Sequence, residues 1–410
     1  MLTRFESTSG EELTTLADEA DLYTALAGTG RVTTTLLGLS TNLNLPVRLV
    51  TVDLPSTPHD APCVLFVGMQ HGNEPVGRET LLSTIRDFAE ATDPASLALL
   101  GACRFYFIPT ANPGGFPLYR TIPASGGANM NREHLSLSVI ESRFVQQAIT
   151  DLDPALVVDC HEQFGSSPTT LRVEMLPGRH PMSAPVVTEQ SLSLHAAVQS
   201  ALDAQSIEHG PYSVETDDPW VLRSMCGLRN IPFLLVETPA LNDTIHKWER
   251  FRWYKVVRDA VLAWSGANIA TARAAKRAGE AEMVRRGTAR DVPFNLNTTV
   301  LNPPPLAYTF HGQAPDHLEV FGLDYTDVAG KVTVPMAQAQ WALLPFLFDP
   351  DGPEPVVAAT RVSPTPPPPK VPPFRGRPVA MKVRLDGETH LVTAMKARIG
   401  GTIYEVRLPS

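Results

Sequence analysis

The sequence predicts an α/β protein in which helices cover a largely buried sheet, followed by a smaller β-rich part. Between residues 62 and 266, short apolar runs alternate with stretches of helical period, as in strands connected by helices. After residue 291, proline is frequent and short alternating segments replace the helical periods. We therefore expect a large α/β domain at 1–267, a helical connector at 268–290 and a β-rich domain at 291–410.

The elements of the first part can be read in order. Residues 1–60 contain a polar helical stretch around 10–27 and the strand-like runs VTTTLLGL and VRLVTVDL. The apolar runs that follow are the expected buried strands: CVLFVG, CRFYFI, PALVVDC and NIPFLLV. The segments between them repeat apolar residues every three or four positions, which is typical of amphipathic helices. The last predicted helix begins near His246 and ends at Gly266.

The C-terminal part contains five segments that we expect to form strands: LEVFGLDY, KVTVPM, MKVRLD, THLVTAMKARI and TIYEVRL. A proline-rich stretch at 364–372 is expected to be an extended surface loop or spacer.

The amino-acid composition argues against several classes of function. The chain has 34 Lys and Arg against 43 Asp and Glu, a net charge of −9, which argues against nucleic acid as the main partner. There is no basic run that would favour a membrane surface and no apolar window long enough for a membrane span. The four cysteines are widely spaced and suggest reduced thiols. With no signal-like N-terminus, the sequence favours the cytoplasm.

Two motifs at the ends of predicted strands predict a zinc site. His71 and Glu74 follow the strand at 63–68, and their i, i+3 spacing puts imidazole and carboxylate on the same side of one turn. His161 stands at the end of a later strand and shares a face with Asp159. Two histidines and one glutamate are a catalytic zinc pattern that leaves a fourth position for water.

Further polar residues suggest hydrolysis next to a carboxylate. Glu237 also ends an apolar strand, where it would be the general base of a metal hydrolase. Asn131 and Arg132 lie in a loop rich in glycine and asparagine, and arginine is suited to bidentate binding of a carboxylate. Arg120, earlier in that loop, could stabilise an oxyanion.

From about residue 62 to 262, the order of these motifs resembles the zinc carboxypeptidases of the M14 type. The resemblance is carried by GMQHGNEPVGRETLL, TANPGGF, NMNREHL, VVDCHEQ and GLRNIPFLLVETP, which look like a bacterial metallopeptidase subfamily. It implies a mixed eight-stranded sheet flanked by helices, with 1–267 as the catalytic domain. It also implies one zinc ion per chain, held by His71, Glu74 and His161.

The resemblance assigns the other roles too. Asn131 and Arg132 would bind the terminal carboxylate, Arg120 would stabilise the oxyanion and Glu237 would be the base. Tyr212 is the nearest match to the mobile tyrosine of the family. Two positions depart from the family pattern. Asn129 stands where an aspartate usually orients the first zinc histidine, and Gly114 replaces the usual acid of an NPDG motif.

Three functions stay open at this point. The main expectation is a metallocarboxypeptidase acting on peptides with a free carboxylate. The short gap between Glu74 and His161 is closer to the aspartoacylase and succinylglutamate desuccinylase branch, whose members cleave N-acyl amino acids and carry a β-rich C-terminal domain. The third possibility is a metal-free protein that binds carboxylates through its arginines. The oligomeric state is left open.

Overall fold

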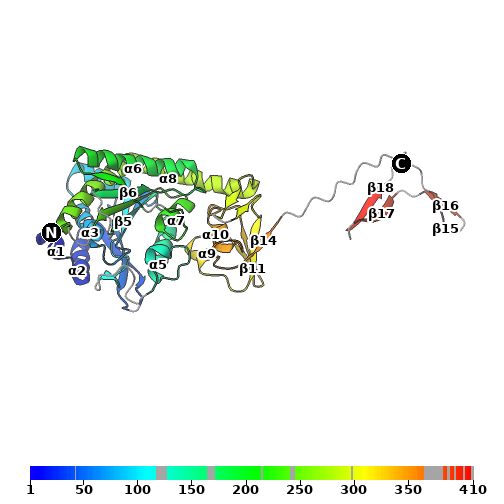
Figure 1. Cartoon of the computed structure of the whole chain (residues 1–410), viewed down its shortest axis with the longest axis horizontal. Helices are drawn as coiled ribbons and strands as arrows, with labels where there is room; N and C mark the ends of the chain where they lie inside the picture. The colour runs from blue at the N-terminus through cyan, green and yellow to red at the C-terminus, as the bar shows by residue number, and fades with distance from the viewer. Residues whose placement is uncertain are drawn as a thin grey trace. The chain divides into compact units, whose positions relative to one another are not determined.

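Figure 1 presents a computed structural model of the chain. It describes residues 1–41, 43–116, 127–163, 171–213, 216–240, 245–296 and 299–363, and the backbone of four strands between 382 and 407. Residues 1–363 form one compact unit and residues 364–410 form a second. The domain boundaries expected after residues 267 and 290 stay a prediction, and both positions lie within the first unit.

An eight-stranded mixed sheet is the centre of the first unit, as the resemblance predicted. Its spatial order is β1-β2-β4-β3-β5-β8-β6-β7. The strands are β1 (Val32–Leu39), β2 (Pro46–Val52), β3 (Cys63–Gly68), β4 (Arg104–Ile108), β5 (Leu156–Gln163), β6 (Val173–Pro177), β7 (His209–Pro211) and β8 (Phe233–Pro239). The central strands β4, β3, β5 and β8 run parallel, whereas β2 pairs antiparallel with β4, and β6 pairs antiparallel with β8.

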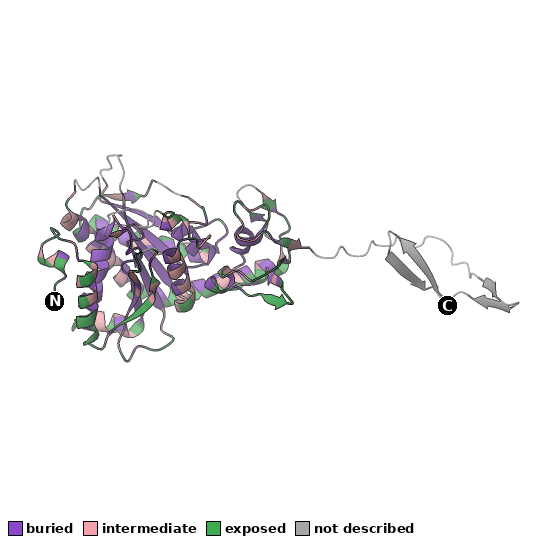
Figure 2. Ribbon diagram, turned by 90° about the horizontal axis from the view of Figure 1, so that it is seen from below, coloured by how far each residue is buried: buried purple, intermediate pink, exposed green. Residues whose placement is uncertain are grey.

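Helices cover both faces of this sheet, which explains why its central strands are buried along nearly their whole length. The α-helices up to residue 289, besides the short α1 (Arg4–Ser7), are α2 (Leu16–Ala27), α3 (Pro75–Ala89), α4 (Pro94–Ala102), α5 (Ile140–Leu152), α6 (Pro185–Ala204), α7 (Leu222–Leu228) and α8 (Lys247–Ala289). One hydrophobic cluster joins the sheet to α2, α3, α6 and α8, and another joins its opposite face to α5 and α7. In Figure 2 the sheet accordingly appears as a buried layer, while the outer sides of helices are exposed.

The prediction that the last helix ends at Gly266 is wrong. α8 is one helix of 43 residues from Lys247 to Ala289 and includes most of the expected connector. Gly266 lowers helix stability by about 1 kcal/mol relative to alanine, but glycine alone does not stop a helix. The helix ends only where Arg290 adopts a left-handed conformation, with φ of 56°.

The part between residues 291 and 363 combines small sheets with two short helices. A four-stranded sheet has the order β12-β13-β11-β14, and a hairpin pairs β9 with β10. The bounds are β9 (Phe294–Asn295), β10 (Val300–Leu301), β11 (Ala307–His311), β12 (Thr326–Val328), β13 (Lys331–Pro335) and β14 (Thr360–Val362). The helices α9 (His317–Val320) and α10 (Leu344–Phe348) were not expected. The first three residues of LEVFGLDY lie in α9, so this segment is not a strand. A short alternating run fits a single helical turn as well as it fits a strand.

The second unit contains two hairpins, which agree with the predicted alternating segments. β15 (Lys382–Leu385) pairs with β16 (Glu388–Leu391), and β17 (Ala394–Ile399) pairs with β18 (Thr402–Arg407). The predicted spacer at 364–372 lies outside the described residues. Among the helices that are described, none has the length and apolar character needed to cross a membrane.

Candidate metal centre

The connection from β3 to α3 carries His71 and Glu74 at the carboxyl edge of the parallel strands. Its tight geometry depends on Gly72, because a Cβ atom there would lie 2.2 Å from the carbonyl carbon of Gly115. The turn at His71 therefore packs directly against the turn at Gly115. Glu74 is the residue immediately before α3, which begins with Pro75, a favoured first residue of a helix.

The end of β5 supplies His161, next to Glu237 of β8 in the register of the two parallel strands. His71, Glu74 and His161 each offer a ligand atom, and these atoms lie within 4.8 Å of one another. The Nδ1 atom of His71 is 2.6 Å from Oε1 of Glu74, and Nδ1 of His161 is 2.8 Å from Oε2. The same nitrogen of both imidazoles thus faces one carboxylate.

The outer nitrogens of the two imidazoles meet oxygen acceptors. Nε2 of His71 lies 3.0 Å from Oδ1 of Asn129, and Nε2 of His161 lies 3.1 Å from Oδ2 of Asp159. A proton on each Nε2 would satisfy these contacts and leave the Nδ1 lone pairs available to a metal ion. The donor set of two imidazole nitrogens and a carboxylate therefore fits zinc.

Electrostatics at the centre favours positive charge. Burial acts to raise the pKa of Glu74, but His71 and His161 outweigh it and lower the pKa of this carboxyl. Burial likewise disfavours the charged form of His161, but Asp159 and Glu74 raise the pKa of its ring well above the ordinary value. The raised pKa of His161 indicates that the carboxylates around it stabilise a positive charge.

Glu237 lines a cavity of about 70 Å³ together with His71 and His161, the two histidines of the metal group. The Glu237 side chain is buried, and burial raises its pKa well above the ordinary value. Glu74, Asp159 and Glu174 raise this pKa further, against the opposing effect of His161. A carboxyl whose proton affinity is raised in this way is suited to accept and return a proton.

The predicted substrate residues are only partly brought together. Asn131, Arg132 and Tyr212 line the same cavity as the two histidines. Asn131 is fixed by its Oδ1, which accepts a hydrogen bond of 3.0 Å from the backbone NH of Leu222 at the start of α7. Arg132 is exposed, and its Nη1 donates to the carbonyl oxygen of Asn131 at 2.6 Å. Arg120 lies outside the described residues.

His134, Glu162, Arg223 and Arg229 are polar residues close to the motifs in the sequence, and of these four only Arg223 lines this cavity. Nε of Arg223 donates to the carbonyl oxygen of Pro177 at 3.2 Å. Glu162 instead accepts from the backbone NH of Val76 and pairs with Arg250 beneath the site. His134 and Arg229 belong to a series of buried hydrogen bonds that leads from Gln70 away from the metal group.

Sequence reasoning missed Gln70, although it directly precedes His71. Nε2 of Gln70 donates to both carboxylate oxygens of Asp159, at 2.9 and 2.8 Å, and thereby holds the partner of His161. The available signal was its place at the end of an apolar strand, where polar side chains enter ligand sites.

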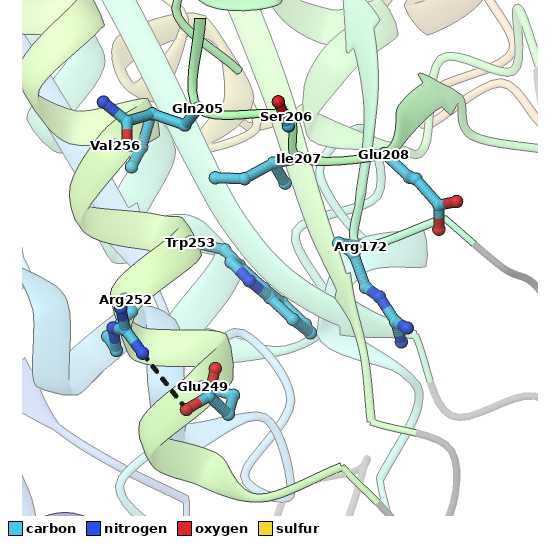
Figure 3. A pocket seen from close by; sticks show the side chains of 9 residues that line it. All are labelled: Arg172, Gln205, Ser206, Ile207, Glu208, Glu249, Arg252, Trp253 and Val256. Carbon is cyan, nitrogen blue, oxygen red and sulfur yellow. Dashed lines mark hydrogen bonds and ion pairs between the residues drawn. The ribbon is translucent and has the colours of Figure 1, made fainter. Parts of the chain in front are cut away.

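A larger groove lies apart from this centre (Figure 3). It has a volume of about 510 Å³ and is lined by residues of α8 and of the connection from α6 to β7. The guanidinium of Arg172 stands 5.5 Å from the ring centroid of Trp253, and Arg252 pairs with Glu249 at 3.3 Å. None of its lining residues belongs to the metal group.

Comparison with known proteins agrees with this fold. Residues 29–167 match the family model described as zinc carboxypeptidase, Peptidase_M14. Carboxypeptidase E of Caenorhabditis elegans is 28% identical over 202 residues, which are 43% of this chain and 42% of that protein. The chain therefore spans less than half of that curated relative.

Two solved metallo-carboxypeptidases have a similar fold. The Burkholderia cenocepacia structure has a TM-score of 0.51 at 19% identity and covers 60% of this chain and 68% of its own. The Pseudomonas aeruginosa structure, in complex with (2-guanidinoethylmercapto)succinic acid, has a TM-score of 0.51 at 18% identity, covering 63% and 69%. These similarities do not confirm the predicted relation to aspartoacylases. The family model supports the M14 zinc carboxypeptidase family for residues 29–167, and the solved structures support the fold.

Proposed function

We propose that this chain is a zinc-dependent metallocarboxypeptidase that cleaves the amide bond next to the free carboxylate of a peptide. The observation that carries the proposal is the convergence of both Nδ1 atoms on Glu74, in a cavity that Glu237 also lines. Among the described residues this is the one such group of possible metal ligands, which supports a single ion per chain.

The exposed guanidinium of Arg132 would bind the terminal carboxylate of the substrate at the mouth of the cavity. Its planar fork matches the two oxygens of a carboxylate. Asn131 would assist as a hydrogen-bond donor. Its Oδ1 is fixed by Leu222, and its Nδ2, which lies 3.4 Å from Nε2 of His161, would turn to the substrate. Tyr212 would close over the substrate from the connection after β7.

Glu237 would take a proton from the attacking water and return it to the leaving amine. Zinc, when bound, supplies Lewis-acid activation of water and of the scissile carbonyl. Burial of Glu237 supports the transfer, because a raised pKa brings this carboxyl closer to the working pH. Arg120 is proposed as an additional donor to the oxyanion on the basis of the family resemblance alone.

Metal analysis and one substitution test the proposal. The purified protein should contain one zinc ion per chain, and Glu237→Gln should keep that zinc while hydrolysis of C-terminally free peptides is lost. Glu189→Gln on α6 is a control, because it makes the same change at an exposed residue that does not line the cavity. Near-normal turnover in Glu237→Gln would refute the role of the base.

Arg132→Ala separates the substrate classes. It should raise KM for peptides with a free carboxylate far more than for amidated peptides, because only the former offer a partner for the guanidinium. Preference for N-acyl amino acids over peptides would favour the deacylase alternative. Absence of zinc from every preparation, with carboxylate binding retained, would favour the metal-free binding protein.

A further inference from the structure

A second cavity, with a volume of about 240 Å³, lies in the first unit, away from the metal group. Its walls come from the end of α5, the connection from α7 to β8, the second half of α8 and the part after residue 291. None of the residues that line it also lines the cavity at Glu237. The proposed hydrolysis therefore does not explain this space.

Arg229 is the buried cation of this second cavity. Its Nη1 donates to the carbonyl oxygen and to Oε1 of Gln146, at 3.3 and 2.9 Å, and its Nη2 donates to Oγ1 of Thr150 at 2.7 Å. The guanidinium also stands 5.9 Å from the ring centroid of Phe321. These partners are all neutral, and burial lowers the pKa of Arg229 to about 10.

The carboxylates of the cavity are already engaged by other cations. Asp153 and Glu280 each pair with both Lys276 and Arg277 on α8. The cavity lining therefore balances two cations, Arg229 and Lys276, against Asp153 and Glu280. Lys276 pairs with both carboxylates, so among the described residues Arg229 is left without an ion pair. A buried charge without an opposite partner is costly for the folded state. An anion placed in the cavity would offset that cost.

We propose that this cavity is a binding site for a small oxyanion, a carboxylate or a phosphate, which pairs with Arg229. Guanidinium groups bind both classes through paired N–H donors. The cavity is large enough for an organic anion, because one water occupies only about 30 Å³ in the liquid.

A line of buried hydrogen bonds connects this site to the metal centre. It runs from Arg229 through Gln146, His134, Gln70 and Asp159 to His161. Nε2 of Gln146 is 3.2 Å from Nδ1 of His134, and Nε2 of His134 is 2.8 Å from Oε1 of Gln70. An anion that draws the guanidinium away from Gln146 therefore changes the hydrogen bonding of His134.

Titration calorimetry of the zinc-loaded full chain with sodium acetate, and separately with inorganic phosphate, tests the binding. Arg229→Gln should weaken binding by about tenfold or more, because a charged hydrogen-bonding partner is lost. Gln340→Glu should also weaken it, by placing a negative charge on the cavity wall while the contacts of Arg229 remain. Arg172→Gln, which removes an arginine from the groove of Figure 3, should bind as the unaltered protein does.

The experiment also distinguishes this site from the proposed substrate-binding site at Arg132. Acetate alone or phosphate alone would identify the class of anion, and Arg132→Ala should leave binding at this site intact. The proposal is overturned if neither anion binds, or if Arg229→Gln and Gln340→Glu both bind normally. Gln340→Glu decides the matter if Arg229→Gln does not fold. The His134 ring resonances should shift on anion binding in the unaltered protein but not in Arg229→Gln; no shift would disprove the link.

Discussion

Replacement of Asn129 by aspartate should strengthen zinc binding. Both described contacts of the Asn129 side chain use its oxygen: Oδ1 lies 3.0 Å from Nε2 of His71 and accepts from the backbone NH of Asn131 at 2.8 Å. Aspartate can keep both contacts and adds a negative charge behind the imidazole. A hydrogen bond to a charged acceptor is roughly twice as strong as a neutral one, whose net worth is about 1 kcal/mol. The gain of about 1 kcal/mol corresponds to about fivefold in zinc affinity.

Competition against a fluorescent zinc chelator would measure this difference. Asn129→Ala should act in the opposite direction and weaken zinc binding by about 10–100-fold, as expected when the partner of a ligand histidine is removed. Gln199→Glu on α6 is the control, because it adds the same charge at a residue that does not line the cavity. Equal or weaker zinc binding by Asn129→Asp would show that Asn129 does not act on the metal through His71.

Three further predictions concern stability. Arg250→Met should lower the free energy of unfolding in urea by about 3–5 kcal/mol, because the buried carboxylate of Glu162 then loses Arg250. The double variant with Glu162→Gln should recover part of this loss. A loss below about 1 kcal/mol would contradict the prediction. Gly266→Ala should stabilise α8 by up to about 1 kcal/mol, since its Cβ would lie 3.5 Å from Leu99. Gly279→Ala should destabilise the protein, since its Cβ would lie 2.8 Å from Val187; the same sign for both variants would refute this packing. Removal of zinc should lower the melting temperature, since a ligand at 100 times its Kd stabilises by about 2.7 kcal/mol; an unchanged melting temperature contradicts a bound ion.

Much of the sheet could be predicted because its signals are local. The apolar runs of β3, β5 and β8 are buried along nearly their whole length, so each can be recognised as a buried strand without knowledge of the rest of the fold. The polar residues that end these strands could also be placed near one another, because parallel strands present their carboxyl ends at one edge. His161 and Glu237 stand side by side in register for this reason.

Other features depend on contacts that local pattern does not encode. α7 has only seven residues, too few to show a helical period, yet it positions Arg223 and ties Leu222 to Asn131. The sequence indicated helices on both sides of Gly266, but their continuity through this glycine goes with packing against α6, which a local pattern does not encode. Tyr212 reaches the cavity from a segment with no strong pattern, so only the family order suggested it.

Because α8 is one unbroken helix, its length fixes the directions in which residues at its two ends point. Its 43 residues span about 65 Å at about 1.5 Å per residue, and each residue turns the helix by about 100°. Its first turns hold Glu162 through Arg250, and its last turns press Gly287 against the backbone of Met336. Deleting one residue between Arg250 and Gly287 would rotate one of these two contacts away from its partner by about 100°. Substitutions along the exposed side of α8 should therefore be tolerated far better than any change in its length.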